Sequence, residues 1–378
     1  MNIILSIVIP TKNRYYYLKF ILDYFSSIPD DDIELVVQDN SDYNISHDTK
    51  IYIDSLNDNR IIYNHNDKDL SQKDNCDLAI YQAKGHYVLM LGDDDIFSKF
   101  LINYCRDWKA QNVDAVLTKR PVYNWPDVTP RFYKNSSSSD FNLPPFKRKE
   151  EEFDLNELKN KFIKTGGVEI GNMPRVYHGI VTKAALDTIY LKTGSFCPGP
   201  SPDIANAISL LFTINKFIYI DVPLIVSGQS IKSAAGKGSQ GQHYDEVYNV
   251  KQLPVNQSQK WLDFVPYYWS GKTIYAQSSF EALEALGLSS VAKRLNKEYM
   301  LASCLVFDFR FFKRIKKAIF NVGFLSIPAI IYYYILIWAN RLKVHFKRFF
   351  KSDKSRLFYL ESNDVRGVID VIDKDINI

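Results

Sequence analysis

The fold of this 378-residue chain is decided by one short stretch, Tyr87-Val88-Leu89-Met90-Leu91-Gly92-Asp93-Asp94-Asp95. Its apolar run predicts a strand that is buried on both faces, with a glycine and three aspartates at its end. Two further apolar runs, at residues 3–9 and 33–37, also end in polar residues, and segments with helical spacing of apolar positions separate the runs. Strands that alternate with helices predict an α/β fold, with a mostly parallel sheet and helices on both faces.

Polar clusters follow three of the predicted strands, at residues 11–14, 39–42 and 93–95. Ligands of open α/β sheets bind at the carboxyl ends of the strands, so we expect these clusters to form one site. Neither a Gly-x-Gly-x-x-Gly fingerprint after the first strand nor a P-loop is present. The sequence therefore predicts a nucleotide held by carboxylates and a metal ion rather than by glycine-cradled phosphates.

The triplet Asp93–Asp95 is the most informative of these clusters. Carboxylates on a tight turn can bind a hard cation and leave coordination positions open for phosphate. A diphosphate leaving group needs such neutralisation, because negative charge accumulates on it as its bond to a sugar breaks. The alternative is a solvated acidic turn, which we expect for the similar triplet Asp30–Asp32, because that triplet precedes an apolar strand instead of ending one.

Three segments, taken together and in this order, resemble the family 2 glycosyltransferases of the GT-A fold: residues 6–14 (SIVIPTKNR), 36–42 (VVQDNSD) and 83–95 (AKGHYVLMLGDDD). The resemblance covers about the first hundred residues well and extends more loosely to Ser230. It implies an inverting enzyme that moves a sugar from a nucleotide-diphosphate sugar to a hydroxyl group of a saccharide acceptor.

The resemblance also implies roles for single residues. Asp39 would contact the base of the donor, Asp93 would approach its ribose, and Asp95 would ligate Mg²⁺ or Mn²⁺. The full donor-binding set is Pro10, Thr11, Asn13, Arg14, Asp39, Asp93 and Asp94. The chain departs from the family pattern at Gln38 and Asn40, and it lacks the arginine expected in the helix before Gly85.

Asp203 is the candidate catalytic base. An acceptor hydroxyl that attacks the anomeric carbon must lose its proton to a carboxylate within hydrogen-bond reach. Asp203 opens a predicted helix after a proline-rich run and matches the family's downstream acidic motif. The alternative role is an ordinary helix N-cap.

Three weaker candidates for the acceptor site or for a loop over the diphosphate are His178, Lys232 and His243. His178 follows an apolar pair, where a satisfied core histidine is the alternative. The other two belong to a segment rich in glycine and serine, which either closes over the diphosphate or is an irregular connection.

The positive charge of the chain is concentrated near its end. Between Arg310 and Arg356 there are twelve Lys and Arg and one acid, a balance of +11 that leaves −7 for the rest of a chain whose net charge is +4. This charge flanks the uncharged residues 318–340 on both sides, which favours helices lying in an anionic membrane surface over nucleic-acid binding. A single span and a buried helical hairpin are the alternatives.

These features predict a domain order and a location. We expect a catalytic domain at 1–245, with a nucleotide-sugar half (1–120) and an acceptor half (121–245), then a helical extension (246–309), membrane-associating helices (310–351) and a C-terminal tail (352–378). Isolated cysteines and the lack of a basic, apolar leader favour the cytoplasmic face of the inner membrane, with peripheral or monotopic attachment. A lipid-linked acceptor in cell-surface polysaccharide (O-antigen or capsule) synthesis suits that location.

Two other functions fit part of the pattern. A metal-dependent nucleotidyltransferase would also combine carboxylates with an α/β nucleotide site, but it needs a glycine-rich basic loop after the first strand, and residues 11–14 contain no glycine. A non-catalytic, membrane-bound sugar-binding module would not depend on Asp95 or Asp203.

Overall fold

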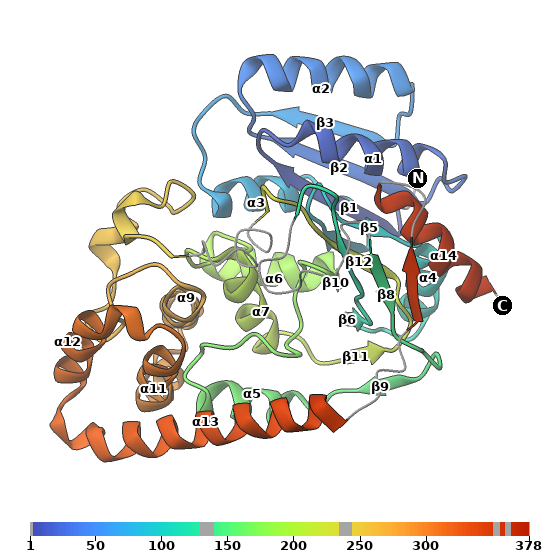
Figure 1. Ribbon diagram of the computed structural model, residues 1–378. Helices are drawn as coiled ribbons and strands as arrows, with labels where there is room; N and C mark the ends of the chain where they lie inside the picture. The colour runs from blue at the N-terminus through green and yellow to red at the C-terminus, as the bar shows by residue number, and fades with distance from the viewer. Residues whose placement is uncertain (1–2, 129–139, 234–243, 351–355, 360–363, 378) are drawn as a thin grey trace.

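The computed structural model describes residues 3–128, 140–233, 244–350, 356–359 and 364–377. Its main sheet has the strand order β3-β2-β1-β4-β10-β6-β11-β9, of which β3, β2, β1 and β4 are parallel neighbours (Figure 1). The predicted α/β fold with a mostly parallel sheet is confirmed. The strands are β1 (Leu5–Thr11), β2 (Ile33–Asp39), β3 (Ile61–His65), β4 (Tyr87–Met90), β6 (Ala115–Thr118), β9 (Glu150–Glu152), β10 (Gly179–Thr182) and β11 (Phe217–Ile220).

Successive residues of the central strands face opposite sides of the sheet, which is why both faces carry helices. Ile7 and Leu89 pack in one hydrophobic core, and Val8 and Val88 pack in another. The first core includes apolar residues of α1 and α4, and the second includes those of α3 and α6. The helices of this part are α1 (Tyr15–Ser26), α2 (Tyr43–Leu56), α3 (Gln72–Tyr81), α4 (Leu101–Ala110), α5 (Leu155–Lys164), α6 (Lys183–Thr193) and α7 (Pro202–Leu211).

The register of the sheet brings the predicted polar clusters together. Thr11 pairs with Asp39 across β1 and β2, and Val8 pairs with Met90 across β1 and β4. The carboxyl ends of β1, β2 and β4 therefore meet at one edge of the sheet. A smaller second sheet, of order β13-β8-β7-β12-β5, adjoins this edge. Its strands are β5 (Ile96–Phe97), β7 (Val122–Asn124), β8 (Asp140–Leu143), β12 (Ile225–Gln229) and β13 (Arg356–Tyr359).

The boundary expected at residue 120 does not separate two packing units. β10 belongs to the expected acceptor half, but it lies between β4 and β6 of the nucleotide-sugar half and pairs with both. The two halves therefore share one sheet.

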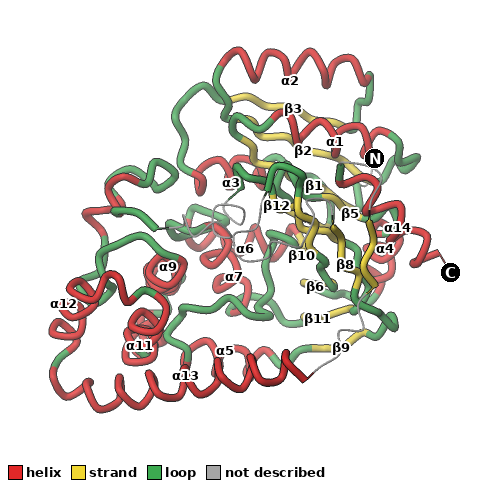
Figure 2. The backbone as a smooth tube through the Cα atoms, viewed as in Figure 1, coloured by secondary structure: helices red, strands yellow, loops and turns green. Residues whose placement is uncertain are grey.

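A helical region without strands forms one end of the molecule (Figure 2). Its helices are α9 (Gly271–Ala285), α10 (Ser289–Arg294), α11 (Lys297–Phe307), α12 (Phe312–Val322) and α13 (Ile327–Phe350). α9 packs against α7, which belongs to the α/β part, and α13 packs along α11. Ile330 and Ile337 are the buried residues by which α13 joins the core of this region.

The end of the chain differs from the expected tail. α14 (Val365–Asn377) packs against α1 and β5, and its buried residues Val368, Ile369 and Ile372 belong to the same core as α1. The physical reason is an apolar stripe at helical spacing, which the strongly charged stretch before it obscures in the sequence. α14 is therefore part of the core that packs against the main sheet.

Candidate active site

The aspartate triplet lies in a buried turn directly after β4. Asp93, Asp94 and Asp95 are each at most 2% exposed. The turn closes on itself, because the Asp95 N–H donates to the Gly92 carbonyl (3.2 Å) and the Gly92 N–H donates to Asp95 Oδ2 (2.6 Å). Three carboxyl groups in so small a buried volume need positive charge or hydrogen-bond donors beside them.

Arg14 supplies positive charge to this turn. Its Nη2 atom lies 3.0 Å from Asp93 Oδ1 and 2.8 Å from Asp94 Oδ2, and it donates to Ser230 Oγ at 2.7 Å. Burial alone would lower the pKa of Arg14, but the charges of Asp93 and Asp94 outweigh burial and raise it. Arg14 lies in the loop between β1 and α1, so the pairing of β1 with β4 brings its side chain to the triplet.

Asp93 is buried, and its two carboxyl oxygens have different partners. Its Oδ2 accepts a hydrogen bond from Thr11 Oγ1 (2.6 Å), whereas its Oδ1 is paired with the charge of Arg14 but accepts no hydrogen bond. Burial raises the pKa of Asp93 to about 7, Arg14 acts against burial, and Asp94 adds to it. Burial also raises the pKa of Asp94, again against Arg14.

Asp95, the predicted metal ligand, is surrounded by hydrogen-bond donors. Its Oδ1 accepts from the Gly228 N–H at 2.8 Å, and its Oδ2 accepts from the Gly92 N–H and from His178 Nε2 at 2.5 Å. Asp95 is not among the residues that line the cavity beside Asp93. In this structure Asp95 fixes β12 and His178 to the turn, and its role as a metal ligand stays a prediction.

His178 is hydrogen-bonded at both ring nitrogens. Its Nδ1 contacts the Arg120 guanidinium, and its Nε2 contacts Asp95 Oδ2. An arginine only donates and a carboxylate only accepts, so the neutral tautomer with the proton on Nε2 satisfies both partners. Burial lowers the pKa of His178, which favours this neutral form. The geometry makes His178 a positioning residue for Asp95, while a contact with the acceptor stays a prediction.

The loops after β1 and β2 are tied together by Asn13 and Asp39. The Asn13 N–H donates to Ser41 Oγ (2.7 Å), and Asp39 accepts from the Ser41 N–H and from the Tyr63 hydroxyl (both 2.8 Å). Asp39 is fully buried and does not line the cavity beside Asp93, whereas its neighbour Asn40 does. The expected contact of Asp39 with a nucleotide base stays a prediction.

A cavity of about 530 Å³ opens beside Asp93, within the size range of small-molecule sites. The ends of β1 and β2, the start of α3 and the segment at residues 244–252 form its walls. The predicted residues that line it are Pro10, Thr11, Arg14, Asp93 and Lys232, and sequence reasoning missed Lys12, Lys251, Tyr244 and Trp269. The lining has four cationic side chains and three carboxylates, Asp69, Asp93 and Asp245, and this excess of positive charge beside aromatic rings suits a nucleoside diphosphate.

The segment after β12 is bound to the triplet. Asp94 Oδ2 accepts from Ser230 twice, from the N–H at 3.0 Å and from Oγ at 2.5 Å. A Cβ on Gly228 would lie 1.7 Å from the Asp94 carbonyl oxygen, so only glycine allows this approach. Lys232 lines the cavity from this segment, its contact with a diphosphate stays a prediction, and His243 lies outside the described residues.

Asp203 lies in the first turn of α7 and is partly exposed to solvent. The N-cap of α7 is Ser201, so Asp203 is not the helix cap that was its alternative role. Burial raises the pKa of Asp203 to about 6, and the positive charges of Arg175 and Arg120 act against this rise. A carboxyl group with this pKa is ionised at neutral pH and is a stronger base than an ordinary aspartate.

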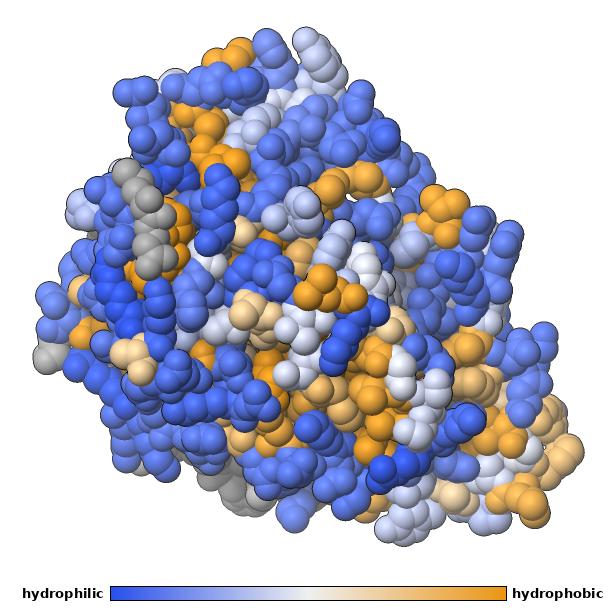
Figure 3. Space-filling model, turned by 180° about the vertical axis from the view of Figure 1, so that it is seen from behind, coloured by the Kyte–Doolittle hydropathy of each residue, from blue (hydrophilic) through white to orange (hydrophobic). Residues whose placement is uncertain are grey.

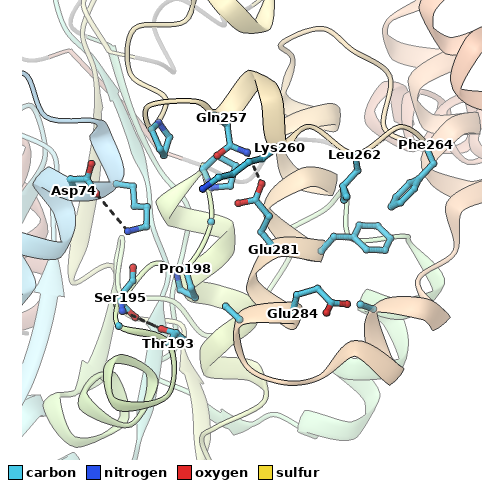
Figure 4. A pocket seen from close by; sticks show the side chains of 18 of the residues that line it. Asp74, Thr193, Ser195, Pro198, Gln257, Lys260, Leu262, Phe264, Glu281 and Glu284 are labelled. Atoms are coloured by element: carbon cyan, nitrogen blue, oxygen red, sulfur yellow. Dashed lines mark hydrogen bonds and ion pairs between the residues drawn. The ribbon is translucent and has the colours of Figure 1, made fainter.

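A second cavity, of about 760 Å³, lies between the segment that precedes α7 and the helices α9 and α10 (Figure 4). Pro198, Lys73 and Asp74 line one side, and Phe264 and Glu281 line the other. Glu281 Oε1 accepts from Gln257 Nε2 at 2.5 Å, and burial raises the pKa of Glu281. The start of α3 separates this cavity from the first one, because neighbouring residues of that turn line each of them.

Among the residues that the structure describes, no group of three or more His, Cys, Asp or Glu side chains is arranged to hold a metal ion. Asp93 lines the cavity, and its Oδ1 atom is buried, accepts no hydrogen bond and is paired with the charge of Arg14. Mg²⁺ typically binds one or two carboxylates together with phosphate oxygens of a substrate. The residues fit an ion that binds together with a diphosphate, rather than a site built from protein ligands alone.

Sequence reasoning missed three residues of this site, Arg120, Arg175 and Ser230. Arg120 was detectable, because it follows β6 by two residues at the same edge of the sheet as the other clusters. Ser230 directly follows β12 and was detectable for the same reason, whereas Arg175 carries no comparable signal because it reaches the site from an irregular segment.

Residues 6–169 match the model of glycosyl transferase family 2. Similar solved structures include TarS 1–349 of S. aureus (15% identity, TM-score 0.46, 84% of this chain and 89% of that chain). They also include the same TarS fragment in complex with UDP-GlcNAc (14%, 0.49, 84% and 89%) and the mannosyltransferase PcManGT of Pyrobaculum calidifontis in complex with GDP-Man and Mn²⁺ (14%, 0.41, 84% and 86%). No curated protein sequence is significantly similar to the chain.

Proposed function

We propose a specific reaction for this chain, whose residues 6–169 belong to glycosyltransferase family 2 and which is therefore a glycosyltransferase that uses a nucleotide-sugar donor. The reaction is transfer of the sugar, with inversion at its anomeric carbon, to a hydroxyl group of a saccharide acceptor. The observation that carries the proposal is the position of Asp93, which lines a cationic cavity and is held by Arg14 at the carboxyl edge of the sheet.

The donor occupies the cavity beside Asp93. Arg14, Lys12, Lys232 and Lys251 face its diphosphate, and Tyr244 and Trp269 provide apolar wall for the nucleoside. Asp93 would hold Mg²⁺ or Mn²⁺ together with phosphate oxygens, and the ion would supply charge neutralisation for the departing diphosphate. Arg14 supplies positive charge at the same place and keeps Asp93 oriented.

Asp203 acts as the base. The acceptor oxygen forms a bond to the anomeric carbon while the bond from that carbon to the diphosphate oxygen breaks, and the diphosphate leaves with the electron pair. The hydroxyl proton passes to the Asp203 carboxylate. The raised pKa and the partial exposure of Asp203 support this role.

The second cavity is the proposed acceptor site. Its polar side chains, among them Gln257 and Glu281, suit sugar hydroxyl groups, and the ring of Phe264 suits a sugar face (Figure 4). Pro200, which lines this cavity, precedes Asp203 by three residues. We propose that the acceptor is lipid-linked, as in cell-surface polysaccharide synthesis, which the basic and apolar helices α12 and α13 support.

Calorimetric titration with UDP, GDP, CDP and dTDP, with and without Mn²⁺, tests the donor half. We expect one of these nucleotides to bind, more tightly with Mn²⁺, and Asp93→Asn to weaken the metal-dependent part. Failure of the wild-type protein to bind any of them would contradict the proposal.

Two variants test the proposed base and the proposed acceptor site. Asp203→Asn should bind the same nucleotide with unchanged affinity and lose transfer by roughly 10²–10⁴-fold. Phe264→Ala should raise the KM for the acceptor and leave donor binding unchanged. Phe100→Ala should alter neither, because Phe100 lines neither cavity. Wild-type turnover by Asp203→Asn would rule out Asp203 as the base and would favour another catalytic group.

A further inference from the structure

The most apolar exposed surface of the described residues is formed by α12, α13 and the turn between them. Of the 26 large hydrophobic residues that are exposed in the described part of the chain, 15 lie from Phe307 to Phe346. Leu325, in the turn between the two helices, is 99% exposed, and its neighbour Phe324 is 68% exposed. Figure 3 shows apolar side chains gathered at the lower right, at the end of the molecule that α12 and α13 form in Figure 1. A large, contiguous apolar patch on the surface of a soluble protein marks an interaction site.

The exposed apolar residues of α13 form one stripe. Ile331, Ile335, Trp338, Leu342 and Phe346 are exposed and recur at helical spacing, so they share one side of the helix. Ile330 and Ile337, which are buried against α11, lie on another side. We call the exposed residues of this stripe, together with Phe320, Phe324 and Leu325, the apolar face.

Positive charge accompanies the apolar face. Exposed lysines lie on both helices, among them Lys313, Lys316 and Lys317 on α12 and Lys343 on α13, and Arg341 stacks on the Trp338 ring at 4.9 Å. The sequence from Phe312 to Phe350 contains no Asp or Glu. An apolar stripe with basic flanks is complementary to the acyl and headgroup layers of an anionic bilayer, whereas a protein partner would have to bring a matching acidic rim.

The helices are unsuited to a continuous span. The segment Phe324–Phe346 is long and apolar enough to cross a membrane, and only 17% of its most apolar part is buried in the protein. However, the uncharged residues 318–340 are divided at Gly323, whose φ of +115° ends α12 and starts a new direction. On α13 alone, the uncharged part from Ile327 to Asn340 is shorter than the roughly 20 residues that a span requires.

The path of the chain gives a second argument against a span. α14 follows α13 in sequence, yet it packs on α1 and β5 inside the catalytic core. The residues before α12 also belong to the body of the protein, since α11 packs against α9. A single crossing by α13 would place α14 on the opposite side of the bilayer from its own packing partners.

We propose that the apolar face lies flat in the surface of an anionic bilayer, with Phe324 and Leu325 inserted most deeply and the catalytic core on one side. This goes beyond the proposed reaction and does not depend on it. In this arrangement the second cavity lies near the membrane. Lys297, the first residue of α11, lines that cavity, and α11 packs along α13.

Vesicle flotation with the full chain tests the proposal. We expect binding to vesicles of phosphatidylcholine with phosphatidylglycerol and at least roughly ten-fold weaker binding to phosphatidylcholine alone. Leu325→Asp combined with Ile335→Asp should reduce binding to the anionic vesicles by at least about ten-fold. The control is Leu191→Asp on α6, because Leu191 is 86% exposed but lies outside the apolar face.

Each other outcome overturns the proposal. Equal loss of binding in the control would show that the face is not responsible, and wild-type binding by the double variant would show that it is not used. Dimers in analytical ultracentrifugation that dissociate in the double variant, without vesicle binding by the wild type, would identify a second copy of the chain as the occupant. Nucleotide titration of the double variant separates these results from the proposed reaction, since donor binding should be unchanged.

A membrane-extraction experiment separates the flat arrangement from a span. Cell membranes that contain the full chain are washed with alkaline carbonate, and we expect the protein in the supernatant. Retention in the pellet, together with protease access to a C-terminal tag from the opposite side of the membrane to an N-terminal tag, would overturn the flat arrangement.

Discussion

The two aspartate triplets of this chain have the same composition and opposite surroundings. Asp30 and Asp32 precede β2 and pair with Arg106 at 2.9 Å, while Asp93 and Asp94 follow β4 and pair with Arg14 at 3.0 and 2.8 Å. Each triplet therefore has one arginine. The difference is burial, because the Asp32 side chain is 45% exposed and the Asp93 side chain is 1% exposed.

The position relative to the strand accounts for this difference. Residues before a parallel strand emerge at the edge of the sheet away from ligands, and residues after it emerge at the edge where loops converge. At the second edge, β12 and the segment to Ser230 cover the triplet and remove it from water. An arginine–aspartate contact of the same length therefore contributes little to the free energy of unfolding at the surface. In the interior, removal of one partner costs much more, because the other charge is left buried and unpaired.

The largest difference between the triplets is expected when the arginine that pairs with each of them is replaced. Arg14→Met leaves two buried carboxyl groups without their positive partner and should cost roughly 3–5 kcal/mol of unfolding free energy, with loss of nucleotide binding. Arg106→Met should cost less than about 1 kcal/mol. Urea unfolding of the two variants measures both values. Equal losses would mean that burial does not distinguish the triplets.

The pH dependence of transfer tests the role of the Asp203 carboxyl group. The pKa of Asp203 is raised above its ordinary value to about 6, mainly by burial. The ionised form of each carboxyl group is the active one, so kcat/KM should begin to fall as Asp93, whose pKa is about 7, becomes protonated. It should fall more steeply below about pH 6, where Asp203 is protonated as well. Initial rates between pH 4.5 and 8 measure this profile. A flat profile down to pH 5 would contradict the role of Asp203, and the residual activity of Asp203→Asn should not show the steeper fall.

The sequence predicted the edge of the sheet at which the site lies, because buried strands and the polar clusters after them are local signals. Thr11, Arg14 and Asp93 were predicted on that basis and meet at the cavity. Arg175, Tyr244 and Trp269 come from distant irregular segments, and no local pattern indicates that they reach the same edge. α14 was missed for a related reason, since its place in the core depends on a tertiary contact with α1.

A smaller effect concerns one carboxyl group of each triplet. Asp93→Asn removes a cavity-lining charge and should weaken metal-dependent nucleotide binding by roughly ten-fold, which is about 1.4 kcal/mol. Asp31→Asn, in the exposed triplet, should leave nucleotide affinity unchanged. Calorimetric titration with the nucleotide that the wild-type protein prefers gives both affinities. Weakening by Asp31→Asn would mean that the second triplet also contributes to the donor site.

The smallest effect is the response of the exposed triplet to salt. Exposed ion pairs are screened at high ionic strength, so the cost of Arg106→Met should fall from a few tenths of a kcal/mol towards zero as NaCl rises from 0.05 to about 1 M. Buried pairs are screened much less, so the cost of Arg14→Met should keep most of its value over the same range. Urea unfolding at the two salt concentrations measures both trends. A strong salt dependence for Arg14→Met would show that water and ions reach the Asp93–Asp95 turn, and it would remove the distinction between the two triplets on which the assignment of the donor site depends.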